Sequence, residues 1–134
     1  MKKVLLLRAT AEGVEFGELP FDNIKDRLQF YYEQLECSCI DIQEAYGLSI
    51  PADLVVDDEA LLKEDYIMNP YASFAYGYLE HGQPIVGHAL IVKPVPTRDG
   101  IEEGGFDDTE LETIKQDLSR LAVDYIMKWG DKGD

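Results

Sequence analysis

Residues 85–92, IVGHALIV, decide the fold of this chain. Because side chains alternate between the two sides of a strand, a stretch that is apolar at nearly every position predicts a strand covered on both sides. His88 is its polar exception, and we place this strand at the centre of a sheet. Residues 2–8 (KKVLLLR) and 53–56 (DLVV) have the composition of further strands. These three segments are the predicted framework of one sheet.

The segments around this framework carry turn and loop signals. Residues 37–42 (CSCIDI) predict a further strand, and residues 57–60 (DDEA) are rich in turn formers. We therefore expect a hairpin in which the chain returns from the preceding strand through residues 61–62. The two prolines that follow residue 92 are expected to end the central strand, because proline cannot donate to a sheet. Residues 97–108 are polar and acidic, which predicts a mobile loop or excursion.

Two segments have the periodicity of amphipathic helices. The first starts at about Asp22, which can cap it. The second starts at residues 109–112 (TELE), a capping box, and ends at Gly130. In both, apolar residues recur three and four positions apart and so share one helix face. The two stripes are Phe21, Ile24, Leu28, Tyr31 and Leu35, and Leu111, Ile114, Leu118, Leu121, Tyr125 and Trp129.

The order of these elements is strand, helix, several strands and helix, which is not a regular alternation of strands and helices. We therefore predict an α+β fold: a mainly antiparallel sheet of about four to six strands with two amphipathic helices packed on one face. The chain of 134 residues suits a single domain with its own core. This domain is expected over residues 1–130, followed by a solvated tail over residues 131–134.

The chain is strongly acidic, with 27 Asp and Glu against 12 Lys and Arg and a net charge of −15. Such a charge repels nucleic acid and anionic membranes and attracts partners with a basic surface. We expect a protein partner, no direct binding to nucleic acid and no membrane association. Two alternatives stay open: the acids only keep the protein soluble, or they imitate a nucleic-acid backbone.

The apolar runs of the sequence are all shorter than the roughly 18 residues that cross a bilayer. Residues 4–7 are too short for the core of a signal peptide, and Arg8 interrupts them. Cys37 and Cys39 are one residue apart, so a disulfide between them would be strained, which fits a reducing compartment. We therefore expect a cytoplasmic protein.

Candidate chemistry is sparse. Cys37, Cys39, His81 and His88 are the residue types of a zinc site, but their spacing differs from that of structural zinc sites. Residues 57–59 lack the ligand spacing of a calcium loop, and the chain has no phosphate-binding glycine loop. We predict no metal, no cofactor and no catalytic residue.

Residues 69–78 (NPYASFAYGY) hold more polar and aromatic groups than folding obviously requires. Amide, hydroxyl and phenol groups in one short region are typical of ligand and partner sites. The alternative is structural: the asparagine caps a helix that starts at Pro70, and the tyrosines cover the edge of the sheet. The candidate ligand- or partner-binding residues are Asn69, Tyr71, Ser73, Tyr76 and His88.

Four short segments carry a family resemblance: residues 40–42 (IDI), 54–62 (LVVDDEALL), 69–72 (NPYA) and 84–89 (PIVGHA). In this order they resemble a family of small uncharacterised domains from phages, plasmids and other mobile elements of Gram-positive bacteria. The long loop expected over residues 97–108 departs from the family pattern. The resemblance implies an accessory protein of a mobile element that works in the host cytoplasm.

We therefore expect a non-enzymatic acidic accessory protein that binds a protein of the host or of the element. The alternative is a domain that binds or sequesters a small nucleotide-like ligand through residues 69–78. Lys93 and Arg98 are then the nearest groups for a phosphate. An enzyme is the third interpretation, because no set of catalytic side chains is visible in the sequence.

Overall fold

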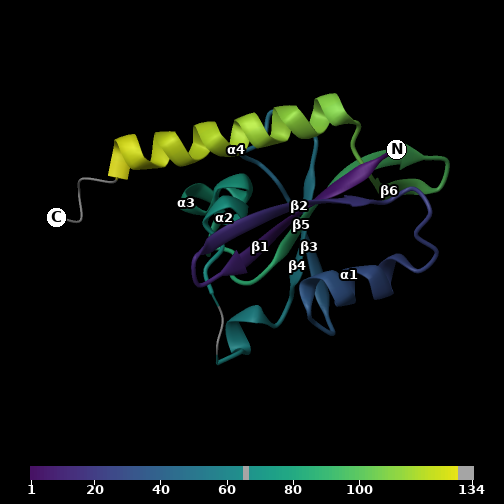
Figure 1. The fold of residues 1–134 in the computed structure, drawn as a ribbon, viewed down its shortest axis with the longest axis horizontal. Helices are drawn as coiled ribbons and strands as arrows, with labels where there is room; N and C mark the ends of the chain where they lie inside the picture. Colours follow the sequence, from purple (N-terminus) through teal and green to yellow (C-terminus); the bar gives the residue numbers. More distant parts are fainter. Residues whose placement is uncertain (65–66, 130–134) are drawn as a thin grey trace.

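The computed structural model describes residues 1–64 and 67–129, and it has an α+β fold built around a mainly antiparallel sheet (Figure 1). This confirms the predicted fold class. The predicted helix end at Gly130 and the predicted tail, residues 131–134, lie outside the described residues. In chain order the elements are β1 (Lys3–Thr10), β2 (Gly13–Pro20), α1 (Arg27–Leu35), β3 (Ile40–Glu44), β4 (Asp53–Asp57), the 3-10 helix η1 (Ala60–Leu62), α2 (Pro70–Tyr76), α3 (Tyr78–His81), β5 (Ala89–Thr97), β6 (Gly100–Gly104) and α4 (Asp108–Trp129).

The central strand of the sheet is β5, as predicted. The strand order is β2-β1-β5-β4-β3, and β6 pairs with the C-terminal half of β5. Leu90 of β5 lies opposite Leu6 on one side and Val55 on the other. The strand begins at Ala89 rather than at residue 85, because Gly87 adopts a φ of 79° and interrupts the extended chain.

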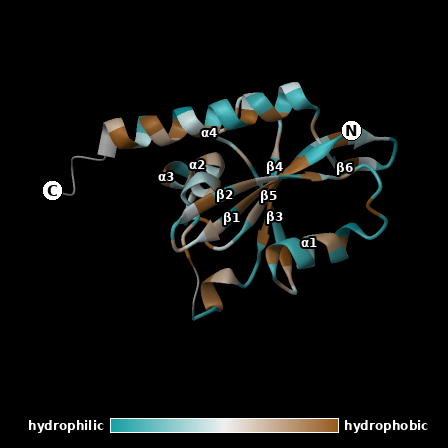
Figure 2. Cartoon of the chain, in the orientation of Figure 1, coloured by the Kyte–Doolittle hydropathy of each residue, from teal (hydrophilic) through white to brown (hydrophobic). Residues whose placement is uncertain are grey.

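The helices cover both faces of the sheet, rather than one face as we expected. Val4, Leu6 and Leu90 pack against α1, whereas Leu5 and Ile91 face α2 and α4. This follows from the alternation of side chains along a strand, because consecutive apolar residues in β1 and β5 require cover on both sides. Figure 1 shows α4 on one side of the sheet and α1 on the other, and Figure 2 shows hydrophobic residues concentrated in the strands between them.

The region expected to be a loop after the central strand is a hairpin instead. β5 continues through both prolines to Thr97 and pairs with β6, so Lys93 lies opposite Gly104. Pro94 and Pro96 are two residues apart, so their missing N–H groups fall on the same edge of the strand and leave the other edge able to pair. The acidic segment before α4 is thereby ordered by the sheet.

The expected return strand at residues 61–62 is the 3-10 helix η1. The Asp57 carboxylate accepts a hydrogen bond from the Glu59 N–H (2.9 Å), and this contact stabilises the turn that leads into η1. The antiparallel partner of β4 is β3 and not residues 61–62. Leu61 and Leu62 are exposed. No hairpin forms after β4 because the chain folds into this single turn.

α4 starts at about the predicted position, whereas α1 starts at Arg27 instead of about Asp22, so Phe21 and Ile24 of its predicted stripe precede the helix. Both helices have caps that differ from the predicted ones. Asp26 caps α1 by accepting the Gln29 N–H (3.0 Å), whereas the Asp22 carboxylate accepts the Lys2 main-chain N–H (2.8 Å). In α4 the capping box is formed by Asp107 and Glu110. Leu28, a member of the predicted first stripe, is 47% exposed. None of the helices in the described residues is long and apolar enough to cross a membrane.

The C-terminal half of α4 extends beyond the sheet and lies over α2 and α3 (Figure 1). Leu111, Ile114 and Leu118 are buried against the sheet, whereas Leu121 and Tyr125 are only half-buried. The last turns of α4 therefore pack on α2 and α3 and not on the sheet core (Figure 1).

Candidate functional site

Asn69, the first predicted site residue, is fully buried, and the fold uses its side chain. Its amide nitrogen donates to the main-chain oxygens of Leu7 (3.0 Å) and Gly87 (2.9 Å), and its amide oxygen accepts the Ala72 N–H (3.1 Å). Both donors are therefore engaged. The structural alternative, that Asn69 caps a helix starting at Pro70, is confirmed.

Ser73 lies one helical turn further on and is also fully buried. Its hydroxyl accepts the Ile85 N–H (2.8 Å) and lies 2.8 Å from the Asn69 carbonyl oxygen, to which it donates. The hydroxyl thus ties α2 to the chain before β5. Neither Asn69 nor Ser73 presents a polar atom to solvent, so we assign both to the construction of the fold.

The two predicted tyrosines of this segment are half-buried and contact different parts of the molecule. The Tyr71 ring meets the Phe16 ring of β2 edge-on, with centroids 5.1 Å apart. The Tyr76 ring lies 6.0 Å from the Tyr46 ring. The structure therefore separates the candidates that the sequence grouped together.

His88, the remaining predicted site residue, lies beside the Arg8–Glu36 ion pair just before β5. Its Nδ1 accepts the Ala9 N–H (3.0 Å), so in the neutral ring the proton is on Nε2, which lies 2.8 Å from a Glu36 carboxylate oxygen. Arg8 contacts the same oxygen at 3.2 Å. Both ring nitrogens are thus engaged within the fold, and the Nδ1 lone pair is taken by a main-chain N–H.

A cavity of about 420 Å³ adjoins this ion pair. The Lys63 ammonium contacts the Asp57 carboxylate (2.6 Å) and the Glu36 carbonyl oxygen (3.1 Å) on another side of the cavity. Glu36 has a φ of 54°, which ends α1 in the left-handed conformation. Arg8 thus links β1 to Glu36 at the end of α1, and Lys63 links Glu36 to Asp57 at the end of β4. Sequence reasoning found His88 here and missed its partners, which are far apart in the chain.

The two cysteines lie near the Asp57 end of this region as free thiols. Burial, and then the charge of Asp57, raises the pKa of Cys37. A hydrogen bond with Glu59 raises the pKa of Cys39, which is exposed. Both thiols are therefore poor nucleophiles at neutral pH. The described residues contain no group of three or more side chains able to hold a metal ion; the side chain of His81 is outside them.

A cavity with aromatic side chains in its lining lies elsewhere, between α3 and the C-terminal half of α4, and we call it the α3–α4 cleft. It encloses about 550 Å³. The Phe74 and Tyr125 rings are in contact across it, with centroids 5.0 Å apart. Burial, and then a hydrogen bond with Tyr125, raises the pKa of Tyr78. The cleft is lined by Tyr46, Gly47, Phe74, Gly77, Tyr78, Leu79, Glu80, Leu121, Asp124 and Tyr125.

The loop that forms one wall of this cleft is held in place on both sides. The Gly47 N–H donates to the Ala75 oxygen (2.8 Å), and a Cβ at Gly47 would lie only 2.5 Å from the Phe74 oxygen. Ser49 donates from its main-chain N–H (2.8 Å) and from its hydroxyl (2.7 Å) to the buried Asp117 of α4. The cleft is thus preformed, because its loop wall is fixed against α2 at Gly47 and against α4 at Asp117.

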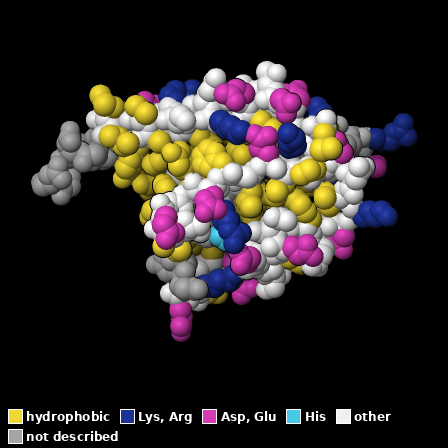
Figure 3. All heavy atoms as spheres, in the orientation of Figure 1, with side chains coloured by type: hydrophobic (Ala, Val, Ile, Leu, Met, Phe, Trp, Pro, Cys, Tyr) yellow, Lys and Arg dark blue, Asp and Glu magenta, His cyan; other side chains and the backbone are white. Residues whose placement is uncertain are grey.

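Two exposed hydrophobic residues, Tyr46 (50%) and Leu79 (56%), line the α3–α4 cleft. Figure 3 shows hydrophobic side chains gathered over the C-terminal half of α4 and the helices beside it. Acidic side chains of Glu80 and Asp124 also line the cleft. Further along α4, Val123 (56%), Ile126 (62%) and Met127 (80%) are exposed as well, but they are not part of the lining. Sequence reasoning missed this surface.

Comparison of the chain with protein-family models, with curated proteins and with solved structures finds no match. The chemistry of the site therefore has to be interpreted from its own residues.

Proposed function

We propose that this protein is a non-enzymatic acidic binding protein that holds a protein partner in the α3–α4 cleft. The observation that carries the proposal is an aromatic cleft whose lining includes the exposed apolar residues Tyr46 and Leu79. Contiguous exposed apolar surface is costly in water, and it marks interaction sites in proteins. Tyrosine side chains, three of which line this cleft, supply the large contact area that anchors such interfaces.

The partner that suits this cleft is an amphipathic helix with basic flanks. Two walls are helices, whose main-chain hydrogen bonds are internal, and the Gly47 N–H of the loop wall is bonded to Ala75, so the cleft offers side-chain contacts rather than a strand edge. Glu80 and Asp124 at the rim and the net charge of −15 attract a basic segment and steer its approach. The apolar face of the helix would fill the cleft, and its lysines and arginines would reach the rim.

Three observations support a binding role over an enzymatic one. Both ring nitrogens of His88 are engaged in the fold. The pKa values of Cys37 and Cys39 are raised, which keeps their thiols protonated. On the face drawn in Figure 3, acids are dispersed among basic and apolar side chains, so the proposal rests on the cleft and not on imitation of nucleic acid.

We further infer that the protein acts in the cytoplasm as an accessory protein of a phage or mobile element. The resemblance carried by residues 40–42, 54–62, 69–72 and 84–89 supports this origin. The free thiols of Cys37 and Cys39 fit a reducing compartment.

A photo-crosslinking amino acid at Tyr46, in cells that express the full chain, tests the proposed surface. We expect a discrete crosslinked product, because Tyr46 lines the cleft and is 50% exposed. Ile101 on β6 is the matched control, since it is apolar and 71% exposed but distant from the cleft. The product should also disappear with Leu79→Asp. Equal products from both positions, or a product that Leu79→Asp leaves unchanged, would overturn the proposal.

A further inference from the structure

The strand β2 forms one edge of the sheet. It is the last strand in the strand order and pairs only with β1, and none of its eight residues is buried. The strand at the other edge, β3, has five residues and offers a shorter ladder. An edge strand exposes main-chain N–H and C=O groups that can pair with another strand. β2 is therefore the longer of the two edges at which this sheet can be extended.

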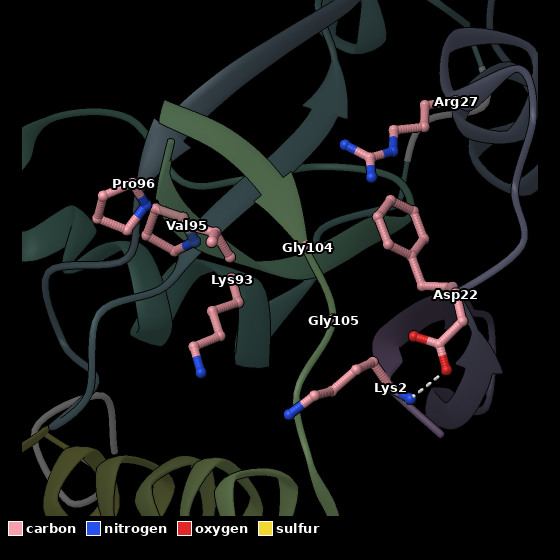
Figure 4. A pocket seen from close by; sticks show the side chains of 10 residues that line it. Lys2, Asp22, Arg27, Lys93, Val95, Pro96, Gly104 and Gly105 are labelled. Atoms are coloured by element: carbon pink, nitrogen blue, oxygen red, sulfur yellow. Dashed lines mark hydrogen bonds between the residues drawn. The ribbon is translucent and has the colours of Figure 1, made fainter. Parts of the chain in front are cut away.

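Contacts at the start of β1 show which groups of β2 point away from the sheet. The Phe21 N–H donates to the Lys2 carbonyl oxygen (3.0 Å), and the Asp22 carboxylate accepts the Lys2 N–H (2.8 Å; Figure 4). Both main-chain groups of Lys3 bond to Phe106 instead (3.0 and 2.7 Å). Because hydrogen-bonded and non-hydrogen-bonded pairs alternate along an antiparallel ladder, the odd-numbered residues of β2 bond to β1. The even-numbered residues direct their main-chain groups outward.

These outward groups have no hydrogen-bond partner within the described part of the chain. Water covers them in the monomer, and a second strand would replace that water with main-chain hydrogen bonds. Pro20 has no N–H and therefore limits the ladder at this end. The unpaired groups are the N–H groups of Val14, Phe16 and Glu18 and the carbonyl oxygens of Val14, Phe16, Glu18 and Pro20.

The side chains of β2 restrict what can pair with it. Phe16, at the middle of the outward residues, is 41% exposed, and the Tyr71 ring holds it edge-on with centroids 5.1 Å apart. Glu18 contacts the Lys3 ammonium at 3.4 Å and also pairs with Lys115 of α4. The charge of Glu18 is therefore compensated within the chain. An additional basic strand has little to gain there, whereas an apolar neighbour is tolerated.

We propose that β2 pairs antiparallel with β2 of a second copy of this chain, centred on Phe16. Counted outward from this centre, Phe16 lies opposite Phe16 of the second copy. Glu18 then lies opposite Val14, and by the same count Glu15 lies opposite Gly17, which has no side chain. Aromatic pairs across two strands stabilise a sheet, and like charges directly opposite each other destabilise it. The sequence of β2 is thus complementary to itself in this register.

The neighbouring registers are less favourable. A centre at Glu15 or at Glu18 places that glutamate directly opposite the same glutamate of the second copy. A centre at Gly17 opposes no like charges, but it places the ring of Phe16 opposite Glu18. The register centred on Phe16 is the one of these four that joins the two rings and keeps the glutamates apart.

The dimer forms against the net charge of each copy, −15. Salt screens this repulsion, so a change from about 0.05 M to about 0.5 M salt should tighten the dimer. Binding of a basic partner responds in the opposite direction, because salt weakens attraction between opposite charges. The residues of β2 do not line the α3–α4 cleft, so the dimer does not depend on the proposed function.

Sedimentation velocity of the full chain under reducing conditions tests the proposal. We expect a dimer at about 100 μM protein and about 0.5 M salt. Phe16→Lys and Phe16→Glu each oppose like charges and should each weaken the dimer about tenfold or more. An equal mixture of the two variants should form a dimer again, because opposite charges then face each other. Ile101→Lys is the matched control, since Ile101 is an apolar strand residue, 71% exposed, on β6.

Four results would overturn the proposal. The first is a monomer up to about 1 mM protein, because a weaker dimer is not specific. The second is a dimer that both Phe16 variants leave intact, and the third is equal weakening by Ile101→Lys. The fourth is a mixture of Phe16→Lys and Phe16→Glu that associates no more tightly than either variant alone. Recovery of the dimer in the mixture also shows that both variants are folded.

Discussion

Residues 69–76 and residues 77–80 are neighbours in the chain, yet they use polar and aromatic groups in opposite ways. In the first segment, Asn69 and Ser73 are buried and bonded to the main chain. In the second, Tyr78 and Leu79 face a preformed cleft and solvent. The difference teaches that residue type does not identify a site. What matters is whether the fold already uses the hydrogen bonds and the apolar surface of each side chain.

The largest effect expected from this comparison is the loss of Asn69. Asn69→Ala leaves the Leu7 and Gly87 oxygens and the Ala72 N–H without their partner. Each unsatisfied buried group costs about 1–3 kcal/mol, so we expect the free energy of unfolding to fall by about 3–5 kcal/mol. Urea unfolding measures this, with the exposed Asn23→Ala as the matched control. Equal losses for the two variants would contradict the structural role of Asn69.

A smaller loss is expected for Ser73. Ser73→Ala removes the acceptor of the Ile85 N–H, which is buried, and should lower the free energy of unfolding by about 1–3 kcal/mol. The exposed Ser119→Ala in α4 is the control, and it should be neutral or slightly stabilising because alanine favours helices. If Ser73→Ala were as harmless as Ser119→Ala, the hydroxyl would not be holding α2 to the sheet.

A buried polar group that the fold does not satisfy provides the contrast to Asn69. One carboxylate oxygen of Glu103 is buried without a hydrogen-bond partner. Burial, and then the charge of Asp53, raises the pKa of Glu103 to about 7. Between the ordinary pKa of glutamate and pH 7, the folded protein holds a proton that the unfolded chain has lost. The protonated Glu103 carboxyl therefore adds to the free energy of unfolding at low pH, and this contribution is lost as the pH rises through 7.

Glu103→Gln should remove this pH dependence. Because Glu103 is only half-buried, we discount the effect of its charge for solvent screening and expect a gain of about 1 kcal/mol at about pH 8 and little change at about pH 5. Urea unfolding of both proteins at the two pH values gives the comparison. An equal effect at both pH values would show that the charge of Glu103 is not responsible.

The smallest effect on stability is expected in the α3–α4 cleft. Leu79→Asp changes a side chain that is 56% exposed, so the free energy of unfolding should change by no more than about 0.5 kcal/mol. Circular dichroism during thermal unfolding measures it. A loss as large as that of Asn69→Ala would place Leu79 with the residues that build the fold.

Much of the fold could be predicted from local patterns. The apolar run before Lys93 predicted the central strand, and the helical cap at Asn69 followed from the Asn-Pro pair. β6 could not be predicted, because residues 100–104 (GIEEG) have little strand propensity and are extended only by pairing with β5. The consecutive apolar residues of β1 indicate that both faces of the sheet are covered. The prediction that both helices pack on one face did not take this into account.

The candidate site was less predictable, because it depends on side chains that are distant in the chain. The contact of Glu36 with Arg8 and His88 has no spacing signature, since three separate elements bring these residues together. The wall formed by Tyr46 and Tyr125 likewise arises from the loop that Gly47 holds against α2. Local sequence shows which residue types are present, whereas the topology decides which of them meet.

The central claim is that apolar contact in the α3–α4 cleft, rather than general charge attraction, holds the partner. Isothermal titration with a helical peptide of leucine and lysine tests it most directly, with wild-type protein and Leu79→Asp compared. The added carboxylate strengthens binding if attraction is only electrostatic, and it weakens binding if the leucines enter the cleft. We predict a loss of affinity of about tenfold or more, the effect of one buried apolar anchor. Equal or tighter binding to Leu79→Asp would contradict the account.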